Sequence, residues 1–236
     1  MNKPVFITFT GADRYTDIMG MLELSDQYSI EWGLLFSPDR QGKADQNRYP
    51  PLSFLREVTA IDMSFAAHLC GGDAQTVLQG GASNHDEFLS VAFERAQINT
   101  SKPVDLDRIA VWGGNIDISV IVQSRDLNAF PSAAQVQWLF DASGGRGLSP
   151  TSWPLPTPGR LNGYAGGLNP LNVGASVEQI GSFIPGASIG TSYWIDMESG
   201  VRDERDRFCL KRCRAVCEAV FGDPGVPRDE QAMSAN

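Results

Sequence analysis

The chain has 236 residues, of which 42% are hydrophobic and 20% are charged, and its formal net charge is −9. Its length suits one large domain or two small ones, and its apolar fraction supplies a sizeable core, which excludes general disorder. An acidic chain without a basic run is a poor candidate for binding nucleic acid or an anionic membrane surface, because both need clustered Lys and Arg.

Short apolar runs alternate with segments of helical periodicity. In chain order we expect strands at 5–10, 30–36, 63–69, 109–112, 118–123, 136–140, 162–165 and 193–197. Helices are expected at 15–24, 51–58, 86–97 and 208–221. Repeated strand-then-helix order predicts a parallel sheet, and this number of strands in this length favours a closed (β/α)₈ barrel. The barrel domain is expected at 1–221, followed by a disordered polar tail at 222–236.

The N-terminal segment has no long apolar region with a small-residue cleavage site, so no signal peptide is expected. No apolar run approaches the ~18 residues that are needed to span a bilayer. We therefore expect a cytoplasmic protein that does not interact with membranes.

Three cysteines, Cys209, Cys213 and Cys217, lie along one face of the last predicted helix. Thiolates stacked on one helix cannot readily surround a tetrahedral ion, so we expect packing rather than metal binding.

A glycine-rich turn follows the predicted strand at 162–165. Gly166 and Gly167 end the strand, and Asn169-Pro170 begins a helix. This arrangement exposes backbone N–H groups at a helix N-terminus and lets a phosphate approach the backbone closely. A tight βα turn without a ligand is the alternative. Ser199-Gly200, after the last strand, would supply the other half of a phosphate site, because phosphate sites in barrels commonly use the loops after strands seven and eight.

Three consecutive pieces of the chain resemble phosphoribosylanthranilate isomerase, a (β/α)₈ barrel of tryptophan biosynthesis. They are Leu139-Phe140-Asp141 with the glycine-rich loop 144–147, the turn 165–173, and the strand end 196–201. In that family they appear as a strand ending in Asp, a glycine-rich loop, a G-G-L-N-P-x-N-V turn and a D-V-S-S-G-V-E strand end. The N-terminal half is similar through 33–36 and Arg48-Tyr49.

The resemblance implies an Amadori rearrangement of a phosphorylated substrate without a metal or organic cofactor. Asp141 stands at the position of the general acid that opens the sugar ring, and Arg48 at the position of the Arg that contacts anthranilate. The substrate-binding positions that it implies are Arg48, Gly145, Arg146, Gly147, Gly166, Gly167, Asp196, Glu198, Ser199 and Gly200. The family's strand-four Q-L-H-G is matched to 110–113.

The sequence departs from the family at the general base. Thr10 occupies the position of the family's Cys, and a Thr hydroxyl is too weak a base without a partner. His68, at the predicted end of strand three, is a replacement base or a hydrogen-bonded structural His. Asp13 is a second candidate or a helix cap. Glu198 is either an acid/base group or a carboxylate at the rim, paired with Arg146 or Arg202.

Two other classes of function remain open. A phosphate-binding barrel with His68 and Asp141 could instead catalyse an epimerase or aldol-type reaction. The chain could also be a non-catalytic barrel that binds a phosphorylated metabolite or a protein partner. The discriminating feature is whether His68 and Asp141 point into one pocket with the glycine turns; the oligomeric state is not predicted.

Overall fold

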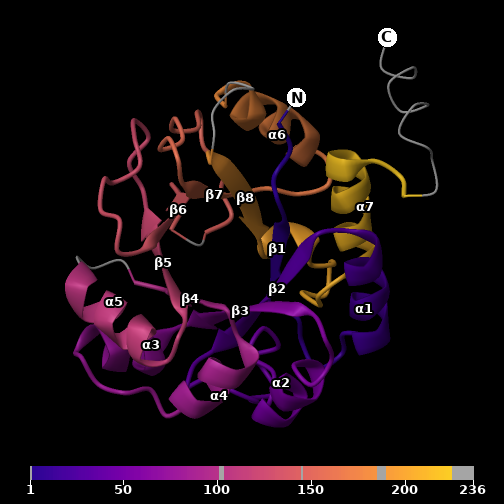
Figure 1. Ribbon diagram of the computed structural model, residues 1–236. Coiled ribbons are helices and arrows are strands. Elements are labelled where there is room, and N and C mark those ends of the chain that lie inside the picture. Colours follow the sequence, from indigo (N-terminus) through magenta and orange to yellow (C-terminus); the bar gives the residue numbers. More distant parts are fainter. Residues whose placement is uncertain (1, 101–103, 145, 185–189, 225–236) are drawn as a thin grey trace.

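The eight strands of the computed structural model close into a barrel in the order β1 to β8 (Figure 1). The structure describes residues 2–100, 104–144, 146–184 and 190–224. Each strand pairs in parallel with the next, and β8 pairs with β1 through the register Ile7↔Ile195. The predicted (β/α)₈ barrel is confirmed.

The strands alternate with helices along most of the chain. The strands are β1 (Ile7–Thr10), β2 (Ile30–Phe36), β3 (Ser64–Leu69), β4 (Arg95–Ile98), β5 (Ser119–Ser124), β6 (Gln137–Asp141), β7 (Leu161–Ala165) and β8 (Ser192–Met197). The helices are α1 (Ile18–Gln27), α2 (Leu52–Val58), α3 (Gly71–Leu78), α4 (Asp86–Ala92), α5 (Leu106–Asn115), α6 (Val173–Ser182), the 3₁₀ helix η1 (Ser199–Val201) and α7 (Leu210–Phe221).

The fourth strand lies elsewhere than predicted. The segment 109–112 belongs to helix α5, and β4 occupies 95–98, inside the predicted helix 86–97. Only Phe93 and Glu94 separate α4 from β4, and neither is a turn residue, so the apolar pattern runs on without a break. The end of strand four is therefore Gln97-Ile98-Asn99. Trp112 faces away from the barrel interior and donates to Asp86.

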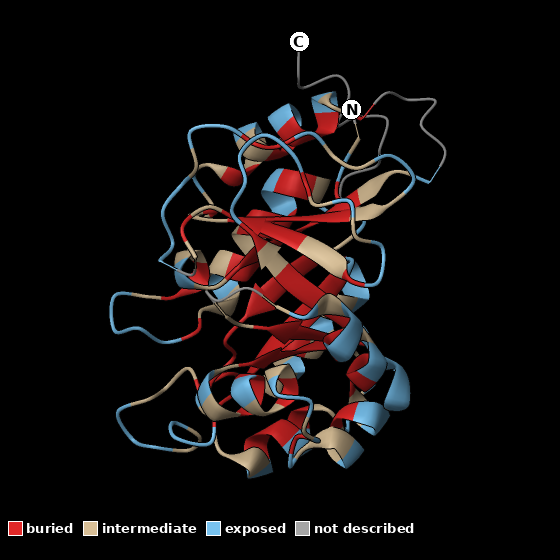
Figure 2. Cartoon of the chain, turned by 90° about the vertical axis from the view of Figure 1, so that its left-hand side faces the viewer, coloured by how far each residue is buried: buried red, intermediate tan, exposed pale blue. Residues whose placement is uncertain are grey.

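The strands are largely buried, whereas the helices expose their outer faces (Figure 2). Most of the core lies between the barrel and the surrounding helices. The N-terminal end of the barrel interior is closed by Arg95, whose guanidinium lies 4.7 Å from the Phe6 ring centroid and 4.4 Å from that of Trp194. Arg95 also pairs with Glu31 at 2.5 Å. Because this end is filled, the ligand-accessible space lies at the carboxyl ends of the strands.

Helix α7 packs beside α6 and α1 (Figure 1). Cys213 and Cys217 are fully buried in this contact, as expected for thiols that pack as small hydrophobes. Burial raises the pKa of Cys217 to about 12 and that of Cys213 well above its ordinary value, so both thiols stay protonated. Among the described residues, no group of three or more His, Cys, Asp or Glu is placed to hold a metal ion.

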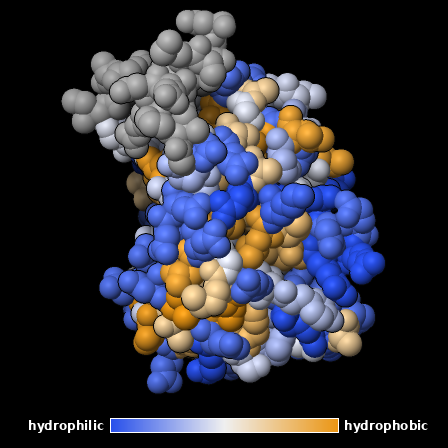
Figure 3. Space-filling model, turned by 90° about the vertical axis from the view of Figure 1, so that its right-hand side faces the viewer, coloured by the Kyte–Doolittle hydropathy of each residue, from blue (hydrophilic) through white to orange (hydrophobic). Residues whose placement is uncertain are grey.

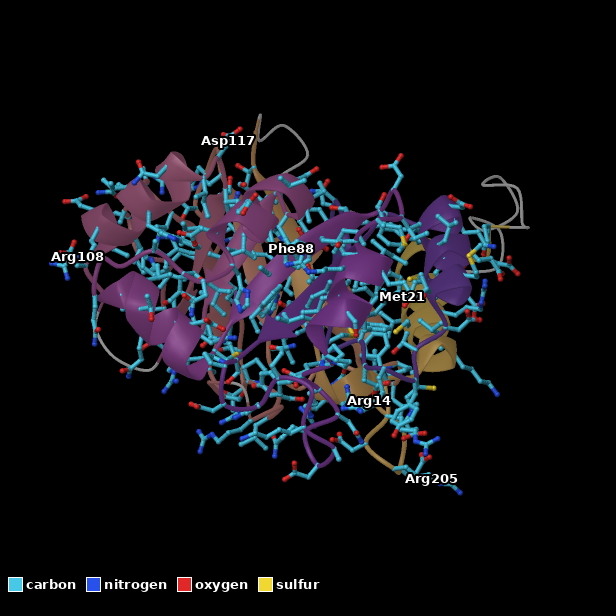
Figure 4. All side chains as sticks on the ribbon, turned by 90° about the horizontal axis from the view of Figure 1, so that it is seen from below. Arg14, Met21, Phe88, Arg108, Asp117 and Arg205 are labelled. Atoms are coloured by element: carbon cyan, nitrogen blue, oxygen red, sulfur yellow. The ribbon has the colours of Figure 1, made fainter. Side chains whose placement is uncertain are left out.

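The outer surface of the barrel is mixed in character. The face in Figure 3 is mostly hydrophilic, with hydrophobic side chains in separate groups. Figure 4 shows Arg108 and Arg205 extending from opposite sides of the periphery. In the described segments, no helix has the length and apolar character that would let it cross a membrane. The predicted tail at 222–236 lies outside the described residues from 225 onward.

Candidate active site

A cavity of about 530 Å³ opens at the carboxyl ends of the strands. Most of the predicted site residues line it, namely Thr10, Arg48, His68, Asp141, Gly147, Gly166, Gly167, Asp196, Glu198, Ser199 and Gly200. His68 and Asp141 thus face one cavity together with both glycine turns, which is the arrangement that the sequence identified as favouring an enzyme. Gly145 lies outside the described residues.

Three polar side chains from β8, β1 and β3 meet at the floor of this cavity. Thr10 Oγ1 donates to Asp196 Oδ1 at 2.9 Å, and His68 Nε2 lies 3.8 Å from Asp196 Oδ2. All three residues are at least nine-tenths buried. Gly33, on β2, leaves room for them, because a Cβ there would lie 2.3 Å from Thr10 Oγ1 and 3.0 Å from His68 Nε2.

Burial keeps both ionisable members of this group neutral. Desolvation, aided by the positive charge of Arg95, lowers the pKa of His68 to about 3. Desolvation raises the pKa of Asp196 to about 8, although the Thr10 hydrogen bond opposes it. At neutral pH the 3.8 Å contact therefore joins an uncharged imidazole and a protonated carboxyl rather than two ions. His68 Nε2 has no hydrogen-bond partner among the described residues.

Asp141, at the end of β6, organises the loop that follows it. Its Oδ1 accepts from the backbone N–H and the hydroxyl of Ser143, at 3.0 and 2.8 Å. The Ser143 hydroxyl oxygen in turn accepts from the backbone N–H groups of Arg146 and Gly147. The carboxylate is thus held at the cavity wall by its own loop. The Arg146 side chain turns back to the Ser143 carbonyl, and Arg146 is not part of the cavity lining.

The two glycine turns are packed directly against each other. A Cβ on Gly200 would lie 1.9 Å from the Leu168 carbonyl oxygen, so only glycine fits there. Gly166 and Gly167 have φ values of +114° and +63°, which favour glycine. A Cβ on Gly167 would lie 2.3 Å from the Ser149 nitrogen. The loop after β6 therefore also closes onto the turn, and the three loops form one continuous wall.

Arg48 spans the rim and already carries two carboxylates. It donates to Glu198 at 2.5 Å and to Asp206 at 2.8 Å. These contacts raise the pKa of Arg48 above its ordinary value, against the effect of burial. The sequence analysis expected Glu198 to pair with Arg146 or Arg202. The structure instead pairs its carboxylate with Arg48.

Asp13 does not line the cavity. It is fully buried, and its carboxylate accepts from Arg202 at 2.9 Å and from the backbone N–H of Phe208 at 2.8 Å. It also accepts from the backbone N–H of Tyr15. Asp13 joins the first βα loop to the segment before α7, and its carboxylate is engaged in that contact rather than lining the cavity.

Several lining residues were not among the predicted site residues: Arg40, Tyr49, Cys70, Gln97, Asn99 and Arg125. Gln97 was missed because the segment 86–97 was predicted as a helix, whereas Gln97 lies on strand β4. A polar residue buried in a short apolar segment is the signal that would have indicated it. Arg125 follows β5 directly and packs against Gly144, in the loop after Asp141.

Comparison with known proteins identifies the fold. No protein-family model matches the sequence, and the search of curated protein sequences finds no match either. Among solved structures, phosphoribosylanthranilate isomerase from Thermus thermophilus is similar, with a TM-score of 0.61 and 18% identity over 91% of this chain and 98% of that one. The Thermotoga maritima enzyme has a TM-score of 0.59 and 13% identity over 94% and 100%.

A more distant similarity links the chain to a second barrel enzyme. A variant of the tryptophan synthase α-subunit from Pyrococcus furiosus has a TM-score of 0.51 and 14% identity, over 94% of this chain and 100% of that one. At these identities the comparisons establish a shared barrel fold. One of the similar phosphoribosylanthranilate isomerase structures is a complex with a reduced 1-(o-carboxyphenylamino)-1-deoxyribulose 5-phosphate.

Proposed function

We propose that this protein is an isomerase that converts a phosphorylated aldosylamine into the corresponding 1-amino-1-deoxyketose by general acid/base catalysis. The observation that carries the proposal is that His68 and Asp141 line one cavity with the glycine turns after β7 and β8. The shared fold with phosphoribosylanthranilate isomerase and the matching Asp141 and glycine-turn motifs support the same reaction class.

The glycine turns bind the phosphate in this proposal. Gly166, Gly167 and Gly200 present backbone without side chains, and the Ser199 hydroxyl lies beside Gly147. The absent Cβ atoms let these loops pack together, because the Cβ positions of Gly167 and Gly200 lie against Ser149 and the Leu168 carbonyl, and the backbone N–H groups of the packed turns would bind the phosphate oxygens. Glu198, which precedes Ser199 on this wall, has its carboxylate paired with Arg48 at 2.5 Å.

Asp141 acts as the general acid. It gives a proton to the ring oxygen of the sugar, the C1–O bond breaks, and the nitrogen lone pair forms a C1=N bond. The hydrogen bonds from Ser143 fix the carboxyl group at the end of β6 for this step. Positioning of this kind supplies the correct geometry before the proton moves.

His68 acts as the general base in place of the family's Cys. Its Nε2 takes the proton from C2, the C–H electron pair forms the C1=C2 bond, and the C=N pair returns to nitrogen. Ketose forms when the C2 hydroxyl of this enolamine loses its proton and C1 gains one. His68 gives this proton to C1, and the C2 hydroxyl proton passes to the Asp141 carboxylate, so both groups are restored while the Asp196 carboxyl, 3.8 Å from Nε2, keeps its own proton.

A direct assay tests the proposal. Ribose 5-phosphate and aniline condense in solution to an aldosylamine, and NMR follows the formation of the 1-anilino-1-deoxyribulose 5-phosphate. We expect the protein to accelerate this reaction and to leave the unphosphorylated ribose adduct at its uncatalysed rate. If both adducts react at their uncatalysed rates in the presence of folded protein, the proposal is wrong. The non-catalytic barrel that binds a metabolite or a protein partner is then the remaining alternative.

A further inference from the structure

Two buried polar atoms on neighbouring strands face the cavity without a protein partner. They are His68 Nε2 on β3 and Gln97 Oε1 on β4, and neither has a hydrogen-bond partner among the described residues. Each residue is 3% exposed, and both line the cavity. His68 and Gln97 are also register partners, so their side chains leave adjacent strands at the same level.

The orientation of the Gln97 amide is fixed by a chain of hydrogen bonds. Its Nε2 donates to Asn99 Oδ1, and Asn99 Nδ2 donates to Cys70 Sγ at 3.0 Å. The amide nitrogen is therefore occupied, and Oε1 is left as an acceptor without a partner among the described residues, on a side chain that lines the cavity. A buried acceptor of this kind is costly unless a ligand donor or a water satisfies it.

We propose that Gln97 is a positioning residue that accepts a hydrogen bond from the C2 hydroxyl of the sugar phosphate, so that the His68–Gln97 pair reads the configuration at C2. The proposal rests on the proposed function. The reacting carbon carries one hydrogen and one hydroxyl, and the pair offers one proton acceptor for each. With the hydroxyl on Gln97, the C2 hydrogen is directed at His68.

The substrate class follows from this geometry. A 2-hydroxy aldose derivative satisfies Gln97 Oε1, whereas a 2-deoxy analogue leaves that buried acceptor unpaired. The C2 epimer exchanges the two groups and directs its hydrogen at the amide oxygen. Sites that are built to bind a hydroxyl discriminate strongly against analogues that lack it. For one neutral hydrogen bond to a buried acceptor we expect a difference in Kd of about 10- to 100-fold.

Calorimetric titration of the whole protein tests the inference. The ligands are ribose 5-phosphate, 2-deoxyribose 5-phosphate, arabinose 5-phosphate and inorganic phosphate. We expect ribose 5-phosphate to bind about 10- to 100-fold more tightly than the 2-deoxy and arabino sugars. Equal binding of the three sugar phosphates would overturn the inference while leaving the phosphate site intact. Failure of all four ligands to bind would overturn the proposed function, and the inference with it.

Variants separate recognition from a structural role. Gln97→Met removes the acceptor at nearly constant volume, and we expect it to abolish the preference for ribose 5-phosphate while inorganic phosphate binds as before. Gln97→Glu retains an oxygen acceptor and should keep part of the preference. Gln75→Met, on the exposed face of α3 and outside the cavity lining, is the control and should leave the ratio of the dissociation constants unchanged. Retention of the full preference in Gln97→Met would contradict the inference.

Discussion

Arg48 and Glu198 are joined by a 2.5 Å ion pair that links the loop after β2 to the end of β8 across the mouth of the cavity. The resemblance to phosphoribosylanthranilate isomerase implies that Arg48 contacts the anthranilate part of the ligand. Here the guanidinium already binds Glu198 and Asp206. A carboxylate on the ligand would have to displace one that the protein itself supplies.

This relationship predicts weak selection for a carboxylate on the amine part of the substrate. We expect kcat/KM for the aldosylamine of aniline to equal that for anthranilate within a few-fold. Glu198→Gln releases part of the Arg48 charge and should favour the anthranilate adduct by about 10-fold, the effect of one charge-assisted contact of about 1.4 kcal/mol. Glu204→Gln, which removes the exposed partner of Arg212, is the control and should leave the ratio unchanged. A strong preference for anthranilate in the unmodified protein would contradict this assignment.

The buried Asp196 predicts an unusual pH dependence of stability. Between pH ~4 and about 8 the unfolded chain has lost the Asp196 proton while the folded protein keeps it, so the free energy of unfolding falls as pH rises. Asp196→Asn removes this term and retains an oxygen acceptor for Thr10. We expect urea denaturation to show that the variant gains stability relative to the unmodified protein as pH rises from 4 to 8, with a slope of up to about 1.4 kcal/mol per pH unit. A difference that is constant with pH would show that Asp196 ionises normally.

The titration of His68 makes the free energy of unfolding depend on pH in the opposite direction. Its lowered pKa of about 3 means that, below pH ~6.5, the unfolded chain binds a proton that the folded protein does not. The free energy of unfolding should therefore fall as pH falls from ~6.5 towards 3. Gln has no titrating group, so His68→Gln should reduce the fall in the free energy of unfolding between pH ~6.5 and 3. Urea denaturation repeated from pH 3 to 7 provides the measurement. If the free energy of unfolding of the variant depends on pH as that of the unmodified protein does, His68 is not a buried neutral group.

Asp13 is predicted to act on stability and not on chemistry. Asp13→Asn removes the buried carboxylate that accepts from Arg202 Nη2 at 2.9 Å and leaves Arg202 with only the exposed carboxylate of Asp206 as an ionic partner. Breaking a buried ion pair by removing one partner costs about 3–5 kcal/mol, and we expect a loss of that order in urea denaturation. At urea concentrations below the denaturation midpoint of Asp13→Asn, the kcat of this variant should differ little from that of the unmodified protein. A large loss of kcat with unchanged stability would instead place Asp13 in the reaction.

The C-terminal half of the fold was predictable because its signals are local. The strand that ends in Asp141, the turn with Gly166 and Gly167, and the loop with Ser199 and Gly200 each depend on residues adjacent in sequence. The structure explains the glycines by close contacts, such as the one between Gly200 and the Leu168 carbonyl. Such positions tolerate only one residue type, so they appear clearly in a sequence.

The errors arose where tertiary packing decides the outcome. Four residues of β4 follow α4 almost directly, and nothing in the local pattern separates them from the helix. Pairing with β3 and β5 makes them a strand. The partners of Glu198 and Asp13 also depend on residues far along the chain, Arg48 and Arg202, whose proximity only the closed barrel creates.

The most direct test of the account is whether His68 removes the C2 proton. The reaction of ribose 5-phosphate with aniline is run in deuterium oxide, and NMR measures ketose formation and deuterium incorporation for the unmodified protein, His68→Gln and Asp141→Asn. We predict that His68→Gln lowers the rate of C2 proton loss by about 10²–10⁴-fold, the usual contribution of a general base, while ribose 5-phosphate still binds. A His68→Gln variant that isomerises the substrate at the unmodified rate would show that His68 is not the general base.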